Sequence, residues 1–553
     1  MTRPKLSVIG VAAAFAIVLA GSVALVGQPS AEVEAKVDRV FEKWSATTPG
    51  CAVGVASGGT PVLSKAYGMA DLEHDVKNTP ETIFEAGSVS KQFTAAAVLL
   101  LARDGKLSLD DPVRKYLPEV PDYGAPLTIR HMLNHTSGLR DWGSVAGIGG
   151  WPRGSRAYTH AHVLDIVSRQ RALNFTPGSR WSYSNTGYNL AAILVSRVSG
   201  MSFAEFTRQR VFEPLGMTRT SWRDDHSRIV KGRAISYADG RDGIRTQMPF
   251  ENVHGNGGLL TTVGDLLKWN ENFVTPKVGD QKFVEEQQQP GRFTDGRAHG
   301  YALGLQVGQY KGIREVAHGG ATAGYRAYLS RYPDAHLSVA VLCNAGSVNP
   351  TQAANAVADI YLAGKIKPSA TLTAKHALTA AEAEAAAGLY RDTVTGEPMT
   401  LVRTADGVRI SNGPVLYPTS PTRFASASGD VLEIGSAGSP TRRTDEYGSV
   451  YTYARVPAAA PTVEQLREYV GTFASEDAEV MLKVELDGSS IVLKRRPDTT
   501  IRLSPLYADA FDSQLGTVVF RRESGRVNAL SVVQSRVWDL RFTKQPLANP
   551  STQ

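Results

Sequence analysis

The segment Gly87-Ser88-Val89-Ser90-Lys91 places a hydroxyl and an amine at a spacing that suits nucleophilic catalysis. Ser88 follows a glycine and precedes the apolar run Phe93 to Leu101, so we expect it at the N-terminus of a buried helix, where backbone N–H groups stabilise negative charge. Lys91 lies on the same helical face, within reach of the Ser88 hydroxyl. Because burial lowers the pKa of a lysine, its neutral amine can take the serine proton.

A serine and a lysine at this spacing, taken alone, indicate a helix N-cap followed by a solvated lysine. Two partner motifs change that interpretation, and the first of them is Tyr183-Ser184-Asn185, the only Y-x-N in the chain. A tyrosine beside a lysine ammonium is expected to have a lowered pKa and to relay a proton between nucleophile and leaving group. Asn185 offers an amide donor and acceptor to a substrate amide or to Lys91. The alternative is an ordinary loop tyrosine before a helix.

The second partner motif is His318-Gly319-Gly320, the only H-x-G, followed by the strand-like segment Tyr325 to Leu329. Glycines on a strand let another backbone approach closely, so a substrate peptide could lie along this edge as an added strand. The N–H of Ala321 is expected to join that of Ser88 as an oxyanion hole. His318 would present a polar side chain, cationic when protonated, to a substrate carboxylate or to the tyrosine. The alternative is a satisfied histidine at a sheet edge.

Together the three motifs resemble those of the penicillin-recognising serine hydrolases, in the branch with class C β-lactamases, DD-carboxypeptidases, D-aminopeptidases and related esterases. The stretches Leu133 to Leu139 and Gly257 to Leu259 agree, and the resemblance covers roughly residues 33 to 363. It implies an acyl-enzyme formed without a metal or a cofactor. It assigns catalysis to Ser88, Lys91 and Tyr183 and substrate contacts to Asn185, His318, Gly320 and Ala321.

The expected function is that of an exported serine peptidase acting on peptides that contain D-amino acids. The third motif begins with His318 where class C β-lactamases usually carry lysine, and this departure resembles the D-aminopeptidase and DD-carboxypeptidase variants. The same machinery used on esters or β-lactams is a second interpretation, and a non-catalytic protein that recognises penicillin or peptides is a third.

The elements that must position these motifs indicate an α+β fold. An amphipathic helix from Val33 to Trp44 precedes two strands, Cys51 to Ser57 and Pro61 to Tyr67, and the Ser88 helix follows. Helices and long loops then predominate up to Asn272. A second set of strands runs from Tyr301 to Asn344, before a closing helix. We therefore predict an antiparallel sheet flanked by helices, with an all-helical lobe, over residues 31–365, as in β-lactamases and transpeptidases.

The C-terminal part of the chain shows a weak internal repeat. Residues 366–378 have the composition of a linker, and Thr379 to Tyr390 then resembles Thr462 to Phe473. Short alternating segments predict antiparallel strands. We expect two β-barrel-like units, residues 379–457 and 461–546, which are either two small barrels or two halves of one. The layout resembles that of D-aminopeptidases, and neither unit contains a catalytic constellation.

The N-terminus has the pattern of a targeting segment. Arg3 and Lys5 precede an apolar stretch from Leu6 to Val26, so residues 1–30 are predicted to be a signal peptide or an N-terminal anchor. Either one implies export, to the periplasm or outside the cell, and the second would also anchor the chain in a membrane. The net charge of +7 is diffuse and gives no nucleic-acid footprint. The expected partner is a small-molecule or peptide substrate, and the oligomeric state stays open.

The chain has two cysteines, Cys51 and Cys343, both in strand-like segments. Two buried free thiols are the favoured expectation. If the two strands pair antiparallel, however, the start of one faces the end of the other, and an exported protein could oxidise the pair. His160 and His162 form an H-x-H without a third ligand at a suitable spacing, so we expect a solvated loop there rather than a zinc site.

Overall fold

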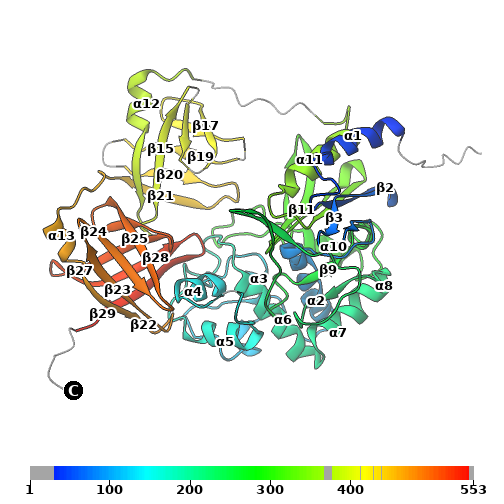
Figure 1. Ribbon diagram of the computed structural model, residues 1–553, viewed down its shortest axis with the longest axis horizontal. Helices are drawn as coiled ribbons and strands as arrows, with labels where there is room; N and C mark the ends of the chain where they lie inside the picture. The colour runs from blue at the N-terminus through cyan, green and yellow to red at the C-terminus, as the bar shows by residue number, and fades with distance from the viewer. Residues whose placement is uncertain are drawn as a thin grey trace, which may run out of the picture.

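The computed structural model describes residues 30–152, 154–366, 376–405, 407–411, 413–427, 429–436 and 439–546. The predicted signal peptide or anchor, apart from Ser30, lies outside these ranges, as do residues 367–375 of the predicted linker. Figure 1 shows a mixed unit of helices and sheet followed by two barrels.

A six-stranded antiparallel sheet organises the first unit. Its strand order is β10-β11-β12-β13-β1-β2, with bounds Gln306–Tyr310, Ile313–Thr322, Tyr325–Tyr332, Leu337–Cys343, Cys51–Ser57 and Thr60–Tyr67. Successive residues of a strand point to opposite faces, so Val53 and Val55 of β1 pack in one core and Ala52 and Ala56 in another. Helices α1 (Ala31–Phe41) and α11 (Pro350–Tyr361) cover the first face. The second face packs on α2 (Lys91–Arg103) and α9 (Val263–Glu271).

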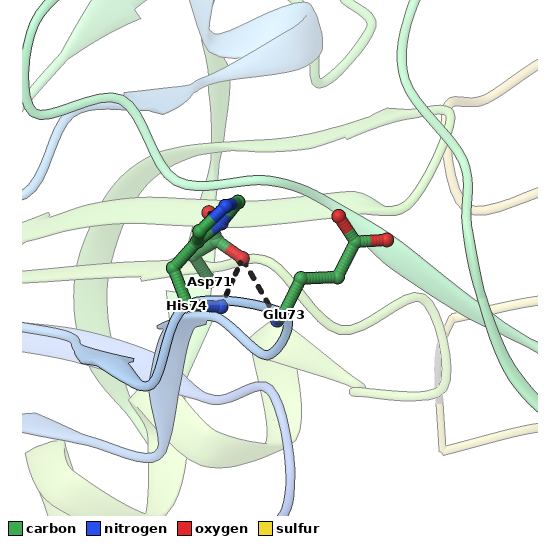
Figure 2. Close-up of side chains that lie close together, drawn as sticks. All are labelled: Asp71, Glu73 and His74. Carbon is green, nitrogen blue, oxygen red and sulfur yellow. Dashed lines mark hydrogen bonds and ion pairs between the residues drawn. The ribbon is translucent and has the colours of Figure 1, made fainter.

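A small hairpin, β3 (Met69–Asp71) with β4 (Val76–Lys77), follows the sheet strand β2. Its turn is organised by the Asp71 carboxylate, which accepts hydrogen bonds from the backbone N–H groups of Glu73 at 2.9 Å and His74 at 3.3 Å (Figure 2). The second Asp71 oxygen lies 2.8 Å from Nδ1 of His74. The side chain of Asp71 therefore serves the local turn.

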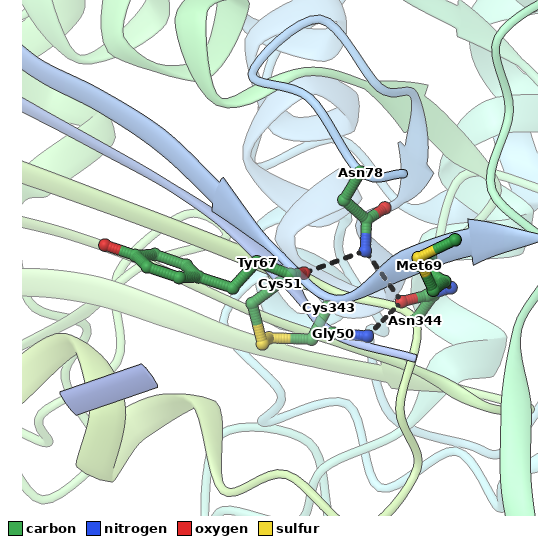
Figure 3. Close-up of a disulfide and its surroundings, with 7 residues drawn as sticks. All are labelled: Gly50, Cys51, Tyr67, Met69, Asn78, Cys343 and Asn344. Carbon is green, nitrogen blue, oxygen red and sulfur yellow. Dashed lines mark hydrogen bonds between the residues drawn. A yellow bond between two sulfur atoms is a disulfide. The ribbon is translucent and has the colours of Figure 1, made fainter. Parts of the chain in front are cut away.

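A disulfide joins Cys51 and Cys343, so the favoured expectation of two free thiols is wrong. Strands β1 and β13 pair antiparallel with these two residues directly opposite each other, and both side chains point to the same face (Figure 3). The register therefore brings the sulfurs together. Next to the bond, Asn344 accepts a hydrogen bond from the Gly50 N–H at 2.8 Å and donates one to the Met69 carbonyl at 2.9 Å.

In the sequence, the helical lobe follows β5 (Phe84–Glu85) and precedes β10 of the large sheet. Its helices are α3 (Ile129–Leu133), α4 (Trp142–Ile148), α5 (His160–Arg169), α6 (Asn185–Ser199), α7 (Phe203–Thr207), α8 (Glu213–Leu215) and α10 (Gln281–Gln288). Two small sheets flank it, one formed by β5 (Phe84–Glu85), β9 (Leu259–Thr261) and β6 (Ser221–Trp222), the other by β7 (Tyr237–Gly240) and β8 (Gly243–Thr246). Among the described helices none is by itself long and apolar enough to cross a bilayer; only the bent pair 185–199 and 203–215 meets that test jointly.

Two closed eight-stranded barrels follow the first unit and, together with it, confirm the predicted fold class. The first consists of β14 (Gly388–Asp392), β15 (Pro398–Thr404), β16 (Gly407–Ile410), β17 (Val415–Pro418), β18 (Arg423–Ala425), β19 (Val431–Glu433), β20 (Thr441–Thr444) and β21 (Val450–Arg455). The second consists of β22 (Gly471–Ser475), β23 (Val480–Asp487), β24 (Ser490–Arg495), β25 (Thr499–Tyr507), β26 (Ala510–Asp512), β27 (Thr517–Glu523), β28 (Arg526–Gln534) and β29 (Val537–Lys544).

The internal repeat corresponds to a shared entry into each barrel. Helix α12 (Ala380–Ala386) begins with a capping box, in which the side chains of Thr379 and Glu382 each accept a hydrogen bond from the other residue's backbone N–H. Helix α13 (Val463–Arg467) begins in the same way. Each helix then leads into the first strand of its own barrel. The repeat therefore encodes two separate barrels and not two halves of one.

The second barrel docks against the helical lobe, to the left of α4 and α5 in Figure 1. Arg140 is buried between them and pairs with Asp477 at 2.7 Å. Gln170 donates to the Asp477 carbonyl at 2.9 Å, and Arg495 donates to the Ile148 carbonyl at 2.9 Å. These contacts fix the barrel relative to α4 and α5.

Candidate active site

Ser88 lies in a 3₁₀ turn, Gly87–Ser90, that leads directly into α2. The turn presses against β11. Gly87 has a φ of 50°, and a Cβ there would lie 2.6 Å from the Ala321 nitrogen. Only glycine fits at this point, because the conformation is left-handed and the two backbones are in contact. The backbone of Ser88 is thus held beside Gly320 and Ala321.

Lys91 begins α2 and is completely buried. Its Nζ lies 3.1 Å from Ser88 Oγ, 2.9 Å from Asn185 Oδ1 and 2.7 Å from the Asn256 carbonyl oxygen. Burial holds the pKa of Lys91 well below its ordinary value, because the charged form loses its hydration. The positive charge of Arg536 adds to this lowering and the negative charge of Asp141 opposes it.

Tyr183 ends the loop before α6, and Asn185 is the first residue of that helix. The Tyr183 ring centroid lies 4.8 Å from Lys91 Nζ. Burial raises the pKa of Tyr183, and a hydrogen bond with Ser88 acts in the opposite direction. The expected lowering of this pKa is therefore wrong. Desolvation of the phenol outweighs the nearby lysine, whose own ammonium form is disfavoured.

The loop containing His135 supports Tyr183 from behind. The two rings lie 4.2 Å apart between centroids, and Nδ1 of His135 accepts a hydrogen bond from the Ser184 N–H at 3.2 Å. The carbonyl of His135 accepts from the Ser182 N–H at 3.0 Å. The histidine thus holds the backbone on both sides of Tyr183. Burial keeps the pKa of His135 well below its usual range, so the ring is neutral.

His318, Gly320 and Ala321 lie on β11, as the motif predicts for a strand. Burial lowers the pKa of His318 to about 3, so the ring is neutral at pH 7 and does not offer the cationic form considered for it. Its Nε2 lies 2.9 Å from the Tyr301 hydroxyl. A Cβ on Gly320 would lie 2.0 Å from the Ala86 carbonyl oxygen, which shows how closely the strand and the Ser88 turn approach.

These elements surround a cavity of about 710 Å³. Ser88, Tyr183 and Asn185 line one side of it, and the His318 to Ala321 segment lines another, while Lys91 is buried behind Ser88. The buried ion pair between Arg223 and Glu85, with Nε and Oε2 2.9 Å apart, contributes to the wall. The structure thus gathers all three sequence motifs around one cavity.

Sequence comparison identifies the family. The profile described as Beta-lactamase matches residues 36–363. The chain belongs to the beta-lactamase family. A penicillin-binding protein of Bacillus subtilis is 30% identical over 52% of this chain and 66% of its own length. A D-aminopeptidase of Brucella anthropi is 31% identical over 54% of this chain and 56% of its own length. The chain thus spans less than two thirds of each of these relatives.

Solved structures share the fold of this beta-lactamase family member. The octameric penicillin-binding protein homologue from Pyrococcus abyssi superposes with a TM-score of 0.54, covering 93% of this chain and 99% of its own, at 21% identity. The D-amino acid amidase from Ochrobactrum anthropi SV3 gives a TM-score of 0.52 over 60% of this chain and 98% of its own, at 22% identity.

Several residues of the beta-lactamase-like site have no sequence signal. Asn256 contacts Lys91 only through its backbone carbonyl oxygen, which any residue type could supply. The resemblance pointed to the neighbouring Gly257 to Leu259 stretch but not to Asn256 itself. Asp141 accepts a hydrogen bond from the Asn185 N–H at 2.8 Å. Arg536 reaches the cavity from the second barrel, and its guanidinium lies 4.8 Å from the Tyr183 ring centroid. Arg536 lies in the two-residue turn between β28 and β29, and nothing in the sequence of that turn predicts that its side chain enters the cavity.

Metal-ligating side chains gather at one place among the described residues, the exposed turn of Asp71, Glu73 and His74 shown in Figure 2. Its hydrogen bonds are those of the turn itself. His160 is half-buried, and its Nε2–H donates to the His254 carbonyl oxygen, 3.0 Å away, while His162 caps α5. These two histidines therefore serve as structural hydrogen-bonding groups, and His160 is not the solvated residue that we expected.

Proposed function

We propose that this protein is an exported serine hydrolase that forms an acyl-enzyme on Ser88 and hydrolyses peptides containing D-amino acids. The named relatives, a penicillin-binding protein and a D-aminopeptidase, support a hydrolase of this family. The buried Cys51–Cys343 disulfide supports export, because disulfides persist in oxidising compartments. The predicted leader supports it as well.

The proposal rests above all on the environment of Lys91. A neutral amine has two N–H groups and one lone pair, and the Asn256 carbonyl and Asn185 Oδ1 are both acceptors. When these two acceptors take the two N–H groups, the lone pair is left for Ser88, whose Oγ lies 3.1 Å away. Lys91 is then the base that accepts the Ser88 proton as the hydroxyl attacks.

The remaining groups complete an acyl transfer. As Ser88 Oγ bonds to the substrate carbonyl carbon, the backbone N–H groups of Ser88 and Ala321 stabilise the oxyanion. A phenol is protonated at neutral pH, and burial raises the pKa of Tyr183 further above that range. Tyr183 therefore gives its proton to the departing nitrogen, and the protonated Lys91 returns a proton to the phenolate. Water then hydrolyses the ester with Lys91 again as the base.

The deciding experiment uses the full chain and its Ser88→Ala variant. Both are incubated with a D-Ala-D-Ala peptide, D-alanine amide, a short nitrophenyl ester and a fluorescent penicillin. We expect hydrolysis of the D-peptide and a covalent adduct on Ser88 by intact-mass spectrometry, with both lost in Ser88→Ala. Hydrolysis of the ester alone would indicate an esterase, and hydrolysis of the penicillin alone a β-lactamase. No turnover of any substrate would indicate a recognition protein.

A further inference from the structure

The turn between β28 and β29 of the second barrel is fastened to the active-site region through its backbone. The Arg536 carbonyl accepts hydrogen bonds from the Asp141 N–H at 3.2 Å and from Asn174 Nδ2 at 3.1 Å. Asn174 Oδ1 in turn accepts from the Trp538 N–H at 2.9 Å. Asp141 also holds the N-terminus of α6 through Asn185. The position of Arg536 is therefore tied to the same residue that positions the catalytic segment.

The side chain of Arg536 extends from this turn into the cavity, where its guanidinium lies 4.8 Å from the Tyr183 ring centroid. Within the described residues no carboxylate forms a hydrogen bond or an ion pair with it. A guanidinium presents a planar set of donors that suits a carboxylate. The cavity thus contains a half-buried cation whose donors are available to a ligand.

The other cations at this cavity already have protein partners. Arg223 is buried and paired with Glu85, and its Nη2 also lies 3.7 Å from Glu251. Arg326 donates to the carbonyl oxygens of Ala323 at 2.9 Å and Tyr325 at 2.7 Å. His318 is neutral, as described above. Arg536 is therefore the cation best placed to bind an anion beside Tyr183.

We propose that Arg536 binds the carboxylate of the departing amino acid and makes this chain selective for peptides with a free D-amino acid at the carboxyl end. The inference rests on the proposed function, in which Tyr183 protonates the leaving nitrogen. When the acyl C–N bond breaks, that nitrogen keeps the electron pair and takes the phenol proton. The departing nitrogen is bonded to the α-carbon of the leaving residue, and that carbon carries the carboxylate. The carboxylate therefore lies on the Tyr183 side of the site, beside Arg536. A substrate ammonium at this place would be repelled.

Paired substrates with one acyl group test the assignment. Acetyl-D-alanyl-D-alanine and its C-terminal amide differ only in the carboxylate. We expect kcat/KM for the acid to exceed that for the amide by roughly ten- to a hundredfold, the usual strength of one charge-assisted hydrogen bond. At a pH on the plateau of the pH–rate profile, Arg536→Gln should remove this ratio by lowering the rate for the acid, whereas Arg536→Lys should keep much of it.

Arg502→Gln is the matched control, since this exposed arginine belongs to the same barrel and is not part of the cavity wall. Its ratio should equal that of the parent protein. A purely structural role for Arg536 would lower both rates equally, and this outcome would overturn the proposal. An unchanged ratio of the acid and amide kcat/KM values in Arg536→Gln would also overturn it. So would loss of this ratio in Arg326→Gln but not in Arg536→Gln.

Binding to the Ser88→Ala variant, measured by calorimetry, separates this inference from the proposed function. If the parent protein hydrolyses neither peptide, the proposed peptidase activity is refuted. Tighter binding of the acid than of the amide, lost in Ser88→Ala/Arg536→Gln, would still support the role of Arg536. Equal binding of the acid and the amide would refute it.

Discussion

Gly320 leaves no room for a side chain against the segment that carries Ser88. A Cβ on Gly320 would lie 3.1 Å from the Ser88 nitrogen and 2.0 Å from the Ala86 carbonyl oxygen. Both contacts are with backbone atoms, so either the strand or the segment that carries Ser88 would have to move. The third motif therefore contains glycine at this position because the strand touches the nucleophile turn.

We expect Gly320→Ala to lower kcat/KM by about a hundredfold or more, since displacing an oxyanion-hole donor by roughly an ångström removes that much rate. Gly319→Ala is the control. Its Cβ would have one neighbour, Tyr328 Cδ2, at an ordinary 3.7 Å. The rate of Gly319→Ala should remain close to that of the parent protein. Equal losses in the two variants would contradict the close approach as the reason for Gly320.

The pH dependence of kcat/KM should report the lowered pKa of Lys91. The active form of the base is the neutral amine, so the rate rises as pH passes upward through the pKa of Lys91. Because burial lowers that pKa, the plateau should be reached well below the ordinary lysine value of 10.5. A pH–rate profile with the neutral amide substrate measures this. A rise that continues to pH 10.5 would contradict the assignment of Lys91 as the base.

Arg536 and Asp141 should move this profile in opposite directions. The arginine charge lowers the pKa of Lys91, so Arg536→Gln should shift the rising limb to higher pH. The Asp141 charge raises the pKa of Lys91, so Asp141→Asn should shift the limb to lower pH. Arg536→Lys keeps the positive charge and should leave the limb near its original position. Shifts of the same sign in Arg536→Gln and Asp141→Asn would show that both variants act through structure and not through charge.

The local features of the site could be predicted from sequence, and the long-range ones could not. Ser88 and Lys91 belong to one short segment, so helical geometry alone brings them together. That Tyr183 and Gly320 lie close to these two residues could be predicted only from the resemblance of the three motifs to a known family. The pKa of Tyr183 was predicted in the wrong direction because residue types show the nearby lysine but do not show how strongly the fold desolvates both groups.

Sequence patterns also do not determine which strands become neighbours. The strand containing Cys51 and the strand containing Cys343 were both recognised, yet only the register of β1 against β13 decides that the two sulfurs meet. In the same way, Arg536 belongs to a barrel whose repeat was visible, whereas its entry into the cavity depends on how that barrel docks. The docking surfaces consist of residues that are far apart in the sequence. A local pattern of apolar and polar residues therefore does not predict how the barrel docks.

The disulfide should contribute strongly to stability. It is fully buried and links residues far apart in the sequence, with a separation of 292, so reducing it enlarges the unfolded ensemble greatly. We expect Cys51→Ala/Cys343→Ala to lose about 2–5 kcal/mol of stability. Thermal unfolding of the variant and the parent protein measures the difference. Thiol labelling of the parent protein, unfolded without reductant, should find no reactive cysteine, and labelling of both would contradict the bond.

The buried pair of Arg140 and Asp477 should control how firmly the second barrel is docked. Arg140 is 3% exposed, so removing its partner leaves a buried charge that keeps only weaker contacts such as Gln170, 3.2 Å away. We expect Asp477→Asn to cost about 2–4 kcal/mol and to increase protease cleavage near the barrel. Glu476→Gln is the control, because the Arg171–Glu476 pair is 3.8 Å apart and both its side chains are exposed. It should change stability by less than about 0.5 kcal/mol.

Loosening this contact should also change selectivity, since the docked barrel presents Arg536 to the cavity. In Asp477→Asn the preference for the acid over the amide should fall while hydrolysis of the amide continues, because Ser88 and Lys91 lie in the other unit. Glu476→Gln should keep the parent preference. If Asp477→Asn loosens the barrel by proteolysis and the preference is nevertheless unchanged, then docking of the second barrel does not determine which leaving group the site accepts.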